Sequence, residues 1–294
     1  MNGHPLRETL AALPPVWSED PLPVIAASNT AADRSIVVLD DDPTGTQTVH
    51  DIPVLTEWSV ACLEAELASA TPLFYILTNS RSLPEAEAKA LAVEIGTNLQ
   101  EASTGSRRGV SVISRSDSTL RGHYPLEVDA LLDSLQCKNA VHVLAPFFEE
   151  GGRFTIGDVH FVAEGDQLIP AADTPFAKDA SFGFRSSNLR DWVQEKTAGR
   201  IPSSDVVSIS IQDVRIGGPG AVTKKLRNAR PGMACVVNAA TMRDIEVFVE
   251  GLLEAERLGG TFIVRSAASY VRARAGLSKR PLLEADVLRN RDSQ

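Results

Sequence analysis

The sequence contains little cysteine. Its 294 residues include only three, and no two of them form a CxxC pair. That spacing argues against a zinc site or a disulfide framework, so we expect Cys62, Cys137 and Cys235 to be buried free thiols. A chain of this length can bury enough apolar surface to fold without disulfides or a structural metal ion. Its 43% hydrophobic and 23% charged residues are typical of a globular protein.

Long hydrophobic runs and an excess of positive charge are also missing. No stretch approaches the roughly 20 apolar residues of a membrane span. The N-terminus, MNGHPLRETLAALPPVWSED, lacks the basic start and apolar core of a signal peptide. The net charge of −9 argues against a nucleic-acid groove as the main binding surface, although it is compatible with a local basic pocket. We therefore expect a cytoplasmic protein whose partner is neither a membrane nor a nucleic acid.

Short apolar runs alternate with segments of helical periodicity. The runs are rich in β-branched residues and largely continuous, which is typical of strands buried on both faces. The predicted strands are 35–40, 72–78, 109–114, 140–145, 205–210, 233–238 and 261–265. The predicted helices are 84–102, 124–136, 187–197, 220–229 and 242–258. This order predicts an α/β fold with a mainly parallel, open sheet and helices on both faces.

Three segments depart from this alternation. Residues 1–34 are rich in Pro and Ala with one predicted helix near 5–13, so we expect a loosely packed N-terminal extension. Residues 151–186 predict a β-hairpin excursion followed by a polar loop, a candidate lid. The core domain is then 35–275, and 276–294 is a tail or linker.

Polar clusters follow four of the predicted strands. They are DDDPTGTQ (40–47), TNSRS (78–82), RSDSTLRGH (115–123) and PFFEEGGR (146–153). In an open parallel sheet, ligands bind outside the carboxyl ends of the strands, where the loops and helix N-termini converge. All four clusters fall on that edge, so we expect them to form one binding site.

The first two clusters combine carboxylates with an arginine. Asp40, Asp41 and Asp42 are adjacent, and a fold tolerates their mutual repulsion only when ligand hydroxyls, a cation, arginines or backbone N–H groups compensate it. The alternative is a solvated acidic turn in which Asp42 caps the next helix. The Arg81 guanidinium has the geometry to bind a substrate carboxylate with two parallel hydrogen bonds, or to pair with one of these aspartates.

The third cluster is the most informative. Residues 117–122 form a turn between a strand and a helix, and they bring a carboxylate, two hydroxyls and a guanidinium into one small volume. Such a set suits a polyhydroxy acid, because an aspartate accepts hydrogen bonds from sugar hydroxyls while an arginine and backbone N–H groups hold a carboxylate. The turn therefore predicts a sugar-acid site.

The motifs DDDPTG, TNSR, RSDSTLRGHYPLE and GGRFTIGDVHF, in this order, resemble those of the four-carbon acid sugar kinases over about residues 35–275. Members of that family phosphorylate tetronates and 3-oxo-tetronates with ATP. The chain departs from the family at Arg115 and Ser116, where a lysine and an apolar residue are usual. The resemblance implies an acid-sugar pocket lined by Asp41, Asp42, Arg81, Asp117, Ser118, Arg121 and Gly122. Thr119 and Arg153 lie in the same motifs and join the predicted substrate-binding set.

The resemblance also implies ATP and Mg²⁺ as cofactors, a small sugar acid as ligand and a homodimer as the assembly. No GxxxxGK[ST] or GxGxxG pattern is present, and RIGGPGA (215–221) predicts a helix-entry loop. We therefore expect the sugar-binding half of a kinase, with no metal site of its own and with a C-terminal nucleotide-binding domain beyond the tail. Asp42 is the predicted base and Asp117 the second candidate, with Arg81 and Arg121 as carboxylate and phosphate clamps.

Two other functions fit parts of the sequence. Asp40-x-Asp42-x-Thr44 after a strand resembles the motif of haloacid-dehalogenase-type phosphatases, with Asp40 as nucleophile, Asp42 as general acid and Mg²⁺ between them. Ser114 could supply the hydroxyl that such a site needs, but no acidic pair follows a late strand. The other alternative is a non-catalytic module that binds an acid sugar.

Overall fold

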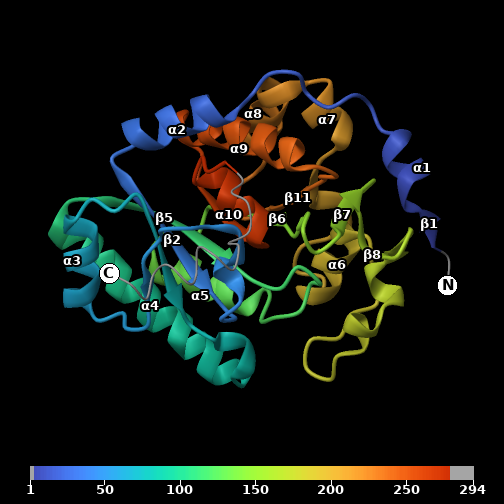
Figure 1. Ribbon diagram of the computed structural model, residues 1–294. Coiled ribbons are helices and arrows are strands. Elements are labelled where there is room, and N and C mark those ends of the chain that lie inside the picture. Colours follow the sequence, from blue (N-terminus) through green and yellow to red (C-terminus); the bar gives the residue numbers. More distant parts are fainter. Residues whose placement is uncertain (1–2, 279–294) are drawn as a thin grey trace, which may run out of the picture.

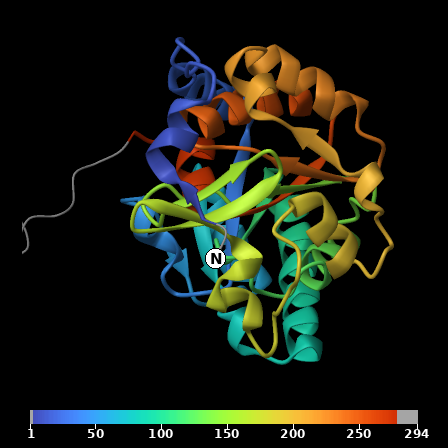
Figure 2. The same ribbon diagram turned by 90° about the vertical axis from the view of Figure 1, so that its right-hand side faces the viewer.

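The computed structural model describes residues 3–278, and its centre is an eight-stranded sheet (Figures 1 and 2). The strand order is β10-β11-β6-β12-β5-β2-β4-β3, and every neighbouring pair is parallel. This confirms the predicted α/β fold. The strands are β2 (Arg34–Asp40), β3 (Val54–Leu55), β4 (Leu73–Leu77), β5 (Gly109–Arg115), β6 (Val141–Ala145), β10 (Val207–Ile209), β11 (Ala234–Val237) and β12 (Phe262–Ser266).

Helices cover both faces of the sheet, as Figure 1 shows. On one face lie α3 (Val60–Ala68), α4 (Glu85–Ser106), α5 (Leu126–Ser134) and α6 (Leu189–Lys196). On the other lie α2 (Leu22–Ala31), α7 (Ile211–Arg215), α8 (Gly218–Asn228), α9 (Met242–Arg257) and α10 (Ala268–Arg274). Short 3₁₀ turns are η1 (Gly45–Thr48), η2 (Ser80–Ser82), η3 (Ala171–Asp173), η4 (Pro175–Lys178) and η5 (Ser203–Asp205).

The continuous apolar runs are explained by these two covered faces. Successive side chains of a strand point to opposite faces. In β2, Ile36 and Val38 therefore pack into the core beneath α9, whereas Val37 and Leu39 pack into the core beneath α4. Each strand has to be apolar on both sides, which is why its sequence does not alternate.

A small antiparallel sheet stands beside the main one, with strand order β1-β9-β8-β7. The predicted hairpin is part of it, but the excursion contributes three strands, β7 (Arg153–Ile156), β8 (Val159–Glu164) and β9 (Gln167–Pro170), and the N-terminal β1 (His4–Pro5) adds a fourth. Gly157 and Asp158 both have positive φ, as the tight turn between β7 and β8 requires. The hairpin prediction was therefore correct but incomplete.

The N-terminal extension is packed more closely than its composition predicts. After α1 (Leu6–Ala11) the chain runs over α8 and α9, shown in blue in Figure 1. Ile25 is fully buried in the core. The Trp17 ring lies against Gly218, and Arg215 donates a hydrogen bond of 2.8 Å to the carbonyl of Pro14. The expectation of a loose arm was wrong because a few apolar side chains among the Pro and Ala residues bury themselves on the helices.

Two of the three cysteines are less buried than expected. All three are free thiols, but only Cys235 is buried, whereas Cys62 and Cys137 are partly exposed.

Within residues 3–278, no helix combines the length and the hydrophobicity needed to cross a bilayer. Of the predicted tail, residues 279–294 lie outside the described part of the chain.

A buried ion pair joins the helices under this extension. Arg215 donates two hydrogen bonds of 2.8 Å to Asp244, whose side chain is fully buried. Asp244 also accepts hydrogen bonds from the backbone N–H groups of Ala240 (2.9 Å) and Thr241 (3.0 Å) at the start of α9. Both charges are thus compensated within the protein.

Replacing Asp244 with Ala should lower the free energy of unfolding by about 3 kcal/mol or more, because it leaves the Arg215 guanidinium buried and unpaired. Urea titration at pH 7 measures this loss. As a control, Asp133→Ala removes an ion pair in which both side chains are largely exposed, and such pairs contribute little. Equal losses in the two variants would contradict the role given to burial.

Candidate functional site

The predicted clusters meet at the carboxyl edge of the sheet. The strands β4, β2, β5 and β12 are neighbours in this order. Their ends carry, respectively, Arg81 in η2, the aspartates 40–42, the turn 116–122 and Arg265. Residues that are distant in sequence therefore converge, because the strand order brings the carboxyl ends of four strands side by side.

The first two aspartates are buried and compensated by the protein itself. Asp40 is 1% exposed and accepts a hydrogen bond of 3.0 Å from Nη1 of Arg115. Asp41 is 3% exposed and accepts hydrogen bonds from Ser116 Oγ (2.6 Å) and Arg81 Nη2 (3.1 Å). Arg115 and Ser116, the two departures from the family pattern, are thus the partners of these carboxylates.

Arg81 holds the third aspartate and links it to the turn 116–122. Its Nη2 lies 2.8 Å from Oδ2 of Asp42, and its Nη1 lies 3.8 Å from Oδ1 of Asp117. Asp42 also accepts a hydrogen bond of 2.8 Å from the backbone N–H of Thr44, so it closes its own turn and does not cap η1, whose N-cap residue is Thr44. Arg81 therefore lies between carboxylates from β2 and from the loop after β5.

The three carboxyl groups at the end of β2 differ in protonation. Burial raises the pKa of Asp40 to about 7, although Arg115 opposes the shift, and burial also raises the pKa of Asp41. For Asp42 burial is the largest single effect and raises the pKa, but the hydrogen bonds from Thr44 and the charges of Arg81 and Arg115 together outweigh it and leave the pKa lowered. Asp42, with 29% of its side chain exposed, is ionised at neutral pH and accessible.

The turn 116–122 is held by hydrogen bonds between its own residues. Asp117 accepts a hydrogen bond of 2.7 Å from Nε of Arg121 and another from the hydroxyl of Thr119. Burial raises the pKa of Asp117, but these hydrogen bonds and the charge of Arg121 outweigh it and leave the pKa lowered. The Thr119 hydroxyl is thus engaged inside the turn. The backbone carbonyl of Ser118 lies 2.8 Å from Nε2 of the buried His160 on β8.

Gly122 is required by the close packing behind this turn. Its φ is +118°, and a Cβ atom there would lie 2.6 Å from Ser116 Oγ and 3.1 Å from Asp41 Oδ2. Any larger residue would push the turn away from the aspartates.

The excursion reaches the site through an aromatic ring. The guanidinium of Arg121 lies 5.1 Å from the ring centroid of Phe176, and that of Arg153, the first residue of β7, lies 5.7 Å from the same centroid. Asp179 contacts Arg121 at 3.8 Å. The predicted site residues Asp42, Asp117, Arg81, Arg121 and Arg153 are therefore joined by a continuous row of ion pairs and ring contacts.

Sequence reasoning missed two residues of the site. Arg265 is buried and donates hydrogen bonds to the carbonyl of Arg121 (2.7 Å) and to Ser116 Oγ (3.0 Å). Glu127, at the start of α5, accepts a hydrogen bond of 2.5 Å from Ser80 Oγ. Burial raises the pKa of Glu127 to about 7. The one signal in the sequence was the charged residue that ends the apolar run TFIVR.

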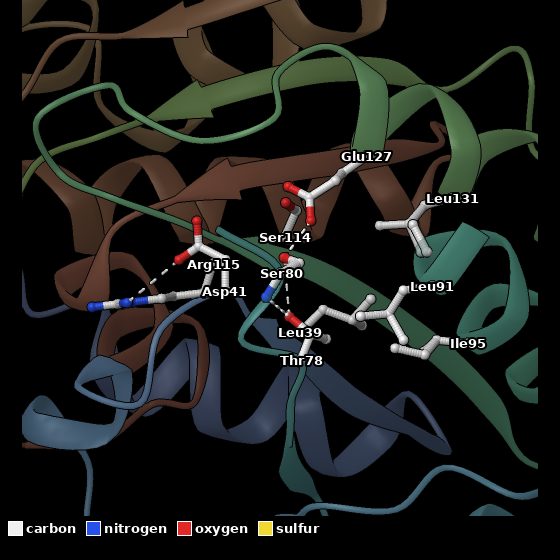
Figure 3. A pocket seen from close by; sticks show the side chains of 11 residues that line it. Leu39, Asp41, Thr78, Ser80, Leu91, Ile95, Ser114, Arg115, Glu127 and Leu131 are labelled. Carbon is white, nitrogen blue, oxygen red and sulfur yellow. Dashed lines mark hydrogen bonds and ion pairs between the residues drawn. The ribbon is translucent and has the colours of Figure 1, made fainter. Parts of the chain in front are cut away.

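A small cavity lies beneath the aspartates (Figure 3). Asp41, Ser80 and Glu127 are among its polar lining residues, and its apolar lining consists of leucine, isoleucine and alanine side chains. Its volume of about 10 Å³ is comparable to one water-sized probe, so it cannot admit a sugar acid. The outer side of the cluster, where 28% of the Arg121 side chain and 29% of that of Asp42 are exposed, is the accessible one.

Asp40 is placed unfavourably for a phosphatase nucleophile. It is almost fully buried and paired with Arg115, and the Gly45 backbone approaches so closely that a Cβ there would lie 1.7 Å from Asp40 Oδ2. Ser114 lines the small cavity below it. In the part of the chain described, no group of three or more His, Cys, Asp or Glu side chains is arranged to hold a metal ion.

Stability should depend on pH through Asp40. Its ordinary pKa is 3.8 and its folded pKa is about 7, so between these values the folded protein holds a proton that the unfolded chain has lost. This group therefore lowers the free energy of unfolding as the pH rises from 4 to 7 and has no further effect above that range.

Asp40→Asn removes this titration while keeping a hydrogen-bonding oxygen for Arg115. We expect the free energy of unfolding of the variant, relative to that of the native chain, to increase by about 2 to 4 kcal/mol between pH 4.5 and pH 7.5. Urea unfolding across that range measures the difference between the two proteins. A difference that does not change with pH would rule out a proton on Asp40.

The chain matches the family of sugar-binding N-terminal domains over residues 36–274. It is 25% identical over 228 residues to D-erythronate kinase of Heliobacterium modesticaldum, an alignment that covers 74% of this chain and 48% of that enzyme. The chain thus spans about half the length of the curated relative that it matches.

Solved structures share the fold. A domain of unknown function from Bordetella bronchiseptica, crystallised with bound citrate as a domain-swapped dimer, has a TM-score of 0.62 and 20% identity, and the match covers 82% of this chain and 56% of that one. A Haemophilus influenzae protein has a TM-score of 0.56 and 19% identity, over 83% of this chain and 57% of that one. Because the family match extends across the whole parallel sheet and the site at its edge, the chain belongs to the family of sugar-binding N-terminal domains.

Proposed function

We propose that this chain binds a four-carbon sugar acid and presents one of its hydroxyl groups for phosphoryl transfer from ATP. The observation that carries this proposal is the row of aspartates and arginines at one sheet edge, which offers acceptors for hydroxyl groups and donors for a carboxylate. The similarity to D-erythronate kinase supports the substrate class and the reaction. The citrate held by the Bordetella protein supports a hydroxylated carboxylate as ligand.

Carboxyl and guanidinium groups are nearly equal in number around the site. The carboxyl groups belong to Asp40, Asp41, Asp42, Asp117, Asp179 and Glu127, and the guanidinium groups to Arg81, Arg115, Arg121, Arg153 and Arg265. Burial raises the pKa of Asp40 and of Glu127 to about 7 and also raises that of Asp41, whereas guanidinium groups stay charged. At neutral pH the protonated fraction of the buried carboxyl groups therefore lowers the negative charge that a bound sugar acid has to meet.

Asp42 is the proposed base. It is ionised, partly exposed and oriented by Arg81 and by the backbone of Thr44, so it is suited to accept the proton of a hydroxyl group that attacks phosphorus. Asp117 is the second candidate, but Arg121 and Thr119 already occupy its carboxylate. Arg81 orients the aspartates and balances their charge during the transfer.

ATP would supply the phosphoryl group, and Mg²⁺ would neutralise its phosphates. The described residues do not fit either as a resident group, because the three adjacent carboxylates are engaged by arginines or a threonine, and the N-terminus of α8 at Gly218 is covered by the Trp17 ring. We therefore propose that a separate nucleotide-binding part supplies them. The division into 1–34, 35–275 and a tail from 276, a cytoplasmic location and a homodimer belong to the same proposal.

One alternative keeps the ligand but not the reaction. A non-catalytic module that binds a sugar acid would use the same aspartates and arginines, and the lack of a nucleotide cradle among the described residues favours it. The phosphatase alternative requires Asp40 to attack a phosphate ester, and its burial against Arg115 argues against that.

The first test is a thermal-shift and calorimetric screen with threonate, erythronate and the 3-oxo-tetronates, each with and without Mg·ATP. A ligand at about 100 times its Kd should stabilise the chain by about 2.7 kcal/mol. We expect one sugar acid to do so and Mg·ATP alone to have no effect. Stabilisation by a phosphate ester with Mg²⁺, and by no sugar acid, would favour the phosphatase instead.

The second test is Asp42→Asn, assayed for phosphoryl transfer with the nucleotide-binding part present. Loss of the base should lower kcat at least about 100-fold and change KM little. The exposed Asp133→Asn is the matched control and should keep full activity. Undiminished turnover in Asp42→Asn would remove Asp42 from this role, and loss of turnover in Asp117→Asn alone would assign it to the second candidate.

A further inference from the structure

Arg153 is the partly exposed arginine of the site for which residues 3–278 provide no carboxylate partner. Arg81, Arg115 and Arg121 each lie within 4.0 Å of at least one aspartate. Arg265 also lacks a carboxylate among the described residues, but it is buried and held by hydrogen bonds and two aromatic rings. Arg153 donates a hydrogen bond to the carbonyl of Gly151, and its Nε is buried without a partner.

The surroundings of Arg153 are those of a cation that lacks its anion. It shares the ring of Phe176 with a second guanidinium, that of Arg121. Two like charges that share one ring repel each other. Burial lowers the pKa of Arg153, and the neighbouring Arg121 lowers it further against the opposite effect of Asp117. A carboxylate bound between the two guanidinium groups would relieve both the repulsion and the missing hydrogen bond.

We propose that Arg153 and Arg121, next to the ring of Phe176, form the subsite for the carboxylate group of the sugar acid. This inference rests on the proposed function and adds the direction in which the ligand lies. Its hydroxyl end faces Asp42 and Arg81, and its carboxylate end faces Arg153.

The order of contacts supports that direction. From the end of β2 the row runs through Asp42, Arg81 and Asp117 to Arg121, and then by way of Phe176 to Arg153. Each guanidinium up to Arg121 is paired with a carboxylate, whereas the last one in the row has none within the described part of the chain. An additional anion is therefore stabilised most at the Arg153 end, whereas at the other end Asp42 repels it.

Arg153 is then a specificity-determining residue that distinguishes acids from neutral polyols. Phe176 is a flat apolar surface that excludes water from one side of the guanidinium groups and so strengthens their interaction with an anion. Asp179 lies 3.8 Å from Arg121. Its side chain is more exposed than that of Asp117, the other carboxylate beside Arg121. A ligand carboxylate would compete with the Asp179 carboxylate for Arg121, whereas at Arg153 it would meet the carbonyl of Gly151 but no carboxylate of residues 3–278.

The test compares threonate with threitol, which has the same four-carbon chain with a CH2OH group in place of the carboxylate. Calorimetric titration, run as a competition experiment for the weaker ligand, gives the Kd of each ligand. In the native chain the Kd for threonate should be at least about tenfold lower than the Kd for threitol. In Arg153→Met this preference should fall to less than about threefold, while the Kd for threitol stays within about threefold. Arg153→Lys should recover part of the preference, because an ammonium group still attracts the carboxylate.

Arg257→Met, which removes an exposed arginine on α9, is the matched control and should keep the native preference. Unfolding midpoints of all variants show whether they are folded. An unchanged preference in folded Arg153→Met, or an equal loss of affinity for both ligands, would overturn the carboxylate subsite. If the native chain bound no sugar acid at all, the proposed function itself would fail, and the subsite with it.

Discussion

Burial of two adjacent carboxylates at the end of β2 is the constraint on which the site depends. Taking Asp40 and Asp41 out of water is costly unless cations and hydrogen-bond donors are held beside them. Those partners, Arg115 and Arg81, come from β5 and from the turn after β4, on either side of β2. The charges can therefore be compensated only when β4, β2 and β5 are neighbours, so the strand order and the site are stabilised together.

The turn 116–122 is fixed by a residue distant in sequence. Arg265, at the end of β12, lies beneath the turn and donates to the carbonyl of Arg121, 144 positions away. Its guanidinium lies 5.7 Å from the ring centroid of Tyr124 and 5.5 Å from that of Trp192. Because α6 carries Trp192, the turn is also connected to the helix that follows the excursion. The position of the Asp117 carboxylate thus depends on packing that spans most of the chain.

Local patterns predicted the sheet well and the tertiary partners poorly. Continuous β-branched runs reveal strands buried on both faces, and the strand-end rule brought Asp42, Arg81 and Asp117 to one edge. Neither rule shows which charges will pair. Glu127 lies within a helical pattern and Arg265 ends a strand pattern, so their roles follow only from how elements pack. Residues 1–34 have the composition of a loop. Composition alone does not show that single apolar side chains of this segment, such as Ile25, are buried in the core.

The two halves of the sheet edge serve different purposes. At β11 the end of the strand is covered by the small sheet, since Thr155 pairs with Ala239 and the side chain of Asn238 binds Asp158 at 2.7 Å. At β4, β2, β5 and β12 the edge carries the charged row instead. The Arg153 end of the row lies next to the small sheet and Phe176, whereas Asp42 at the other end lies beside η1 with 29% of its side chain exposed. The strand order therefore gives the row one end against the small sheet, where Arg153 has no carboxylate among the described residues, and one partly exposed end at Asp42.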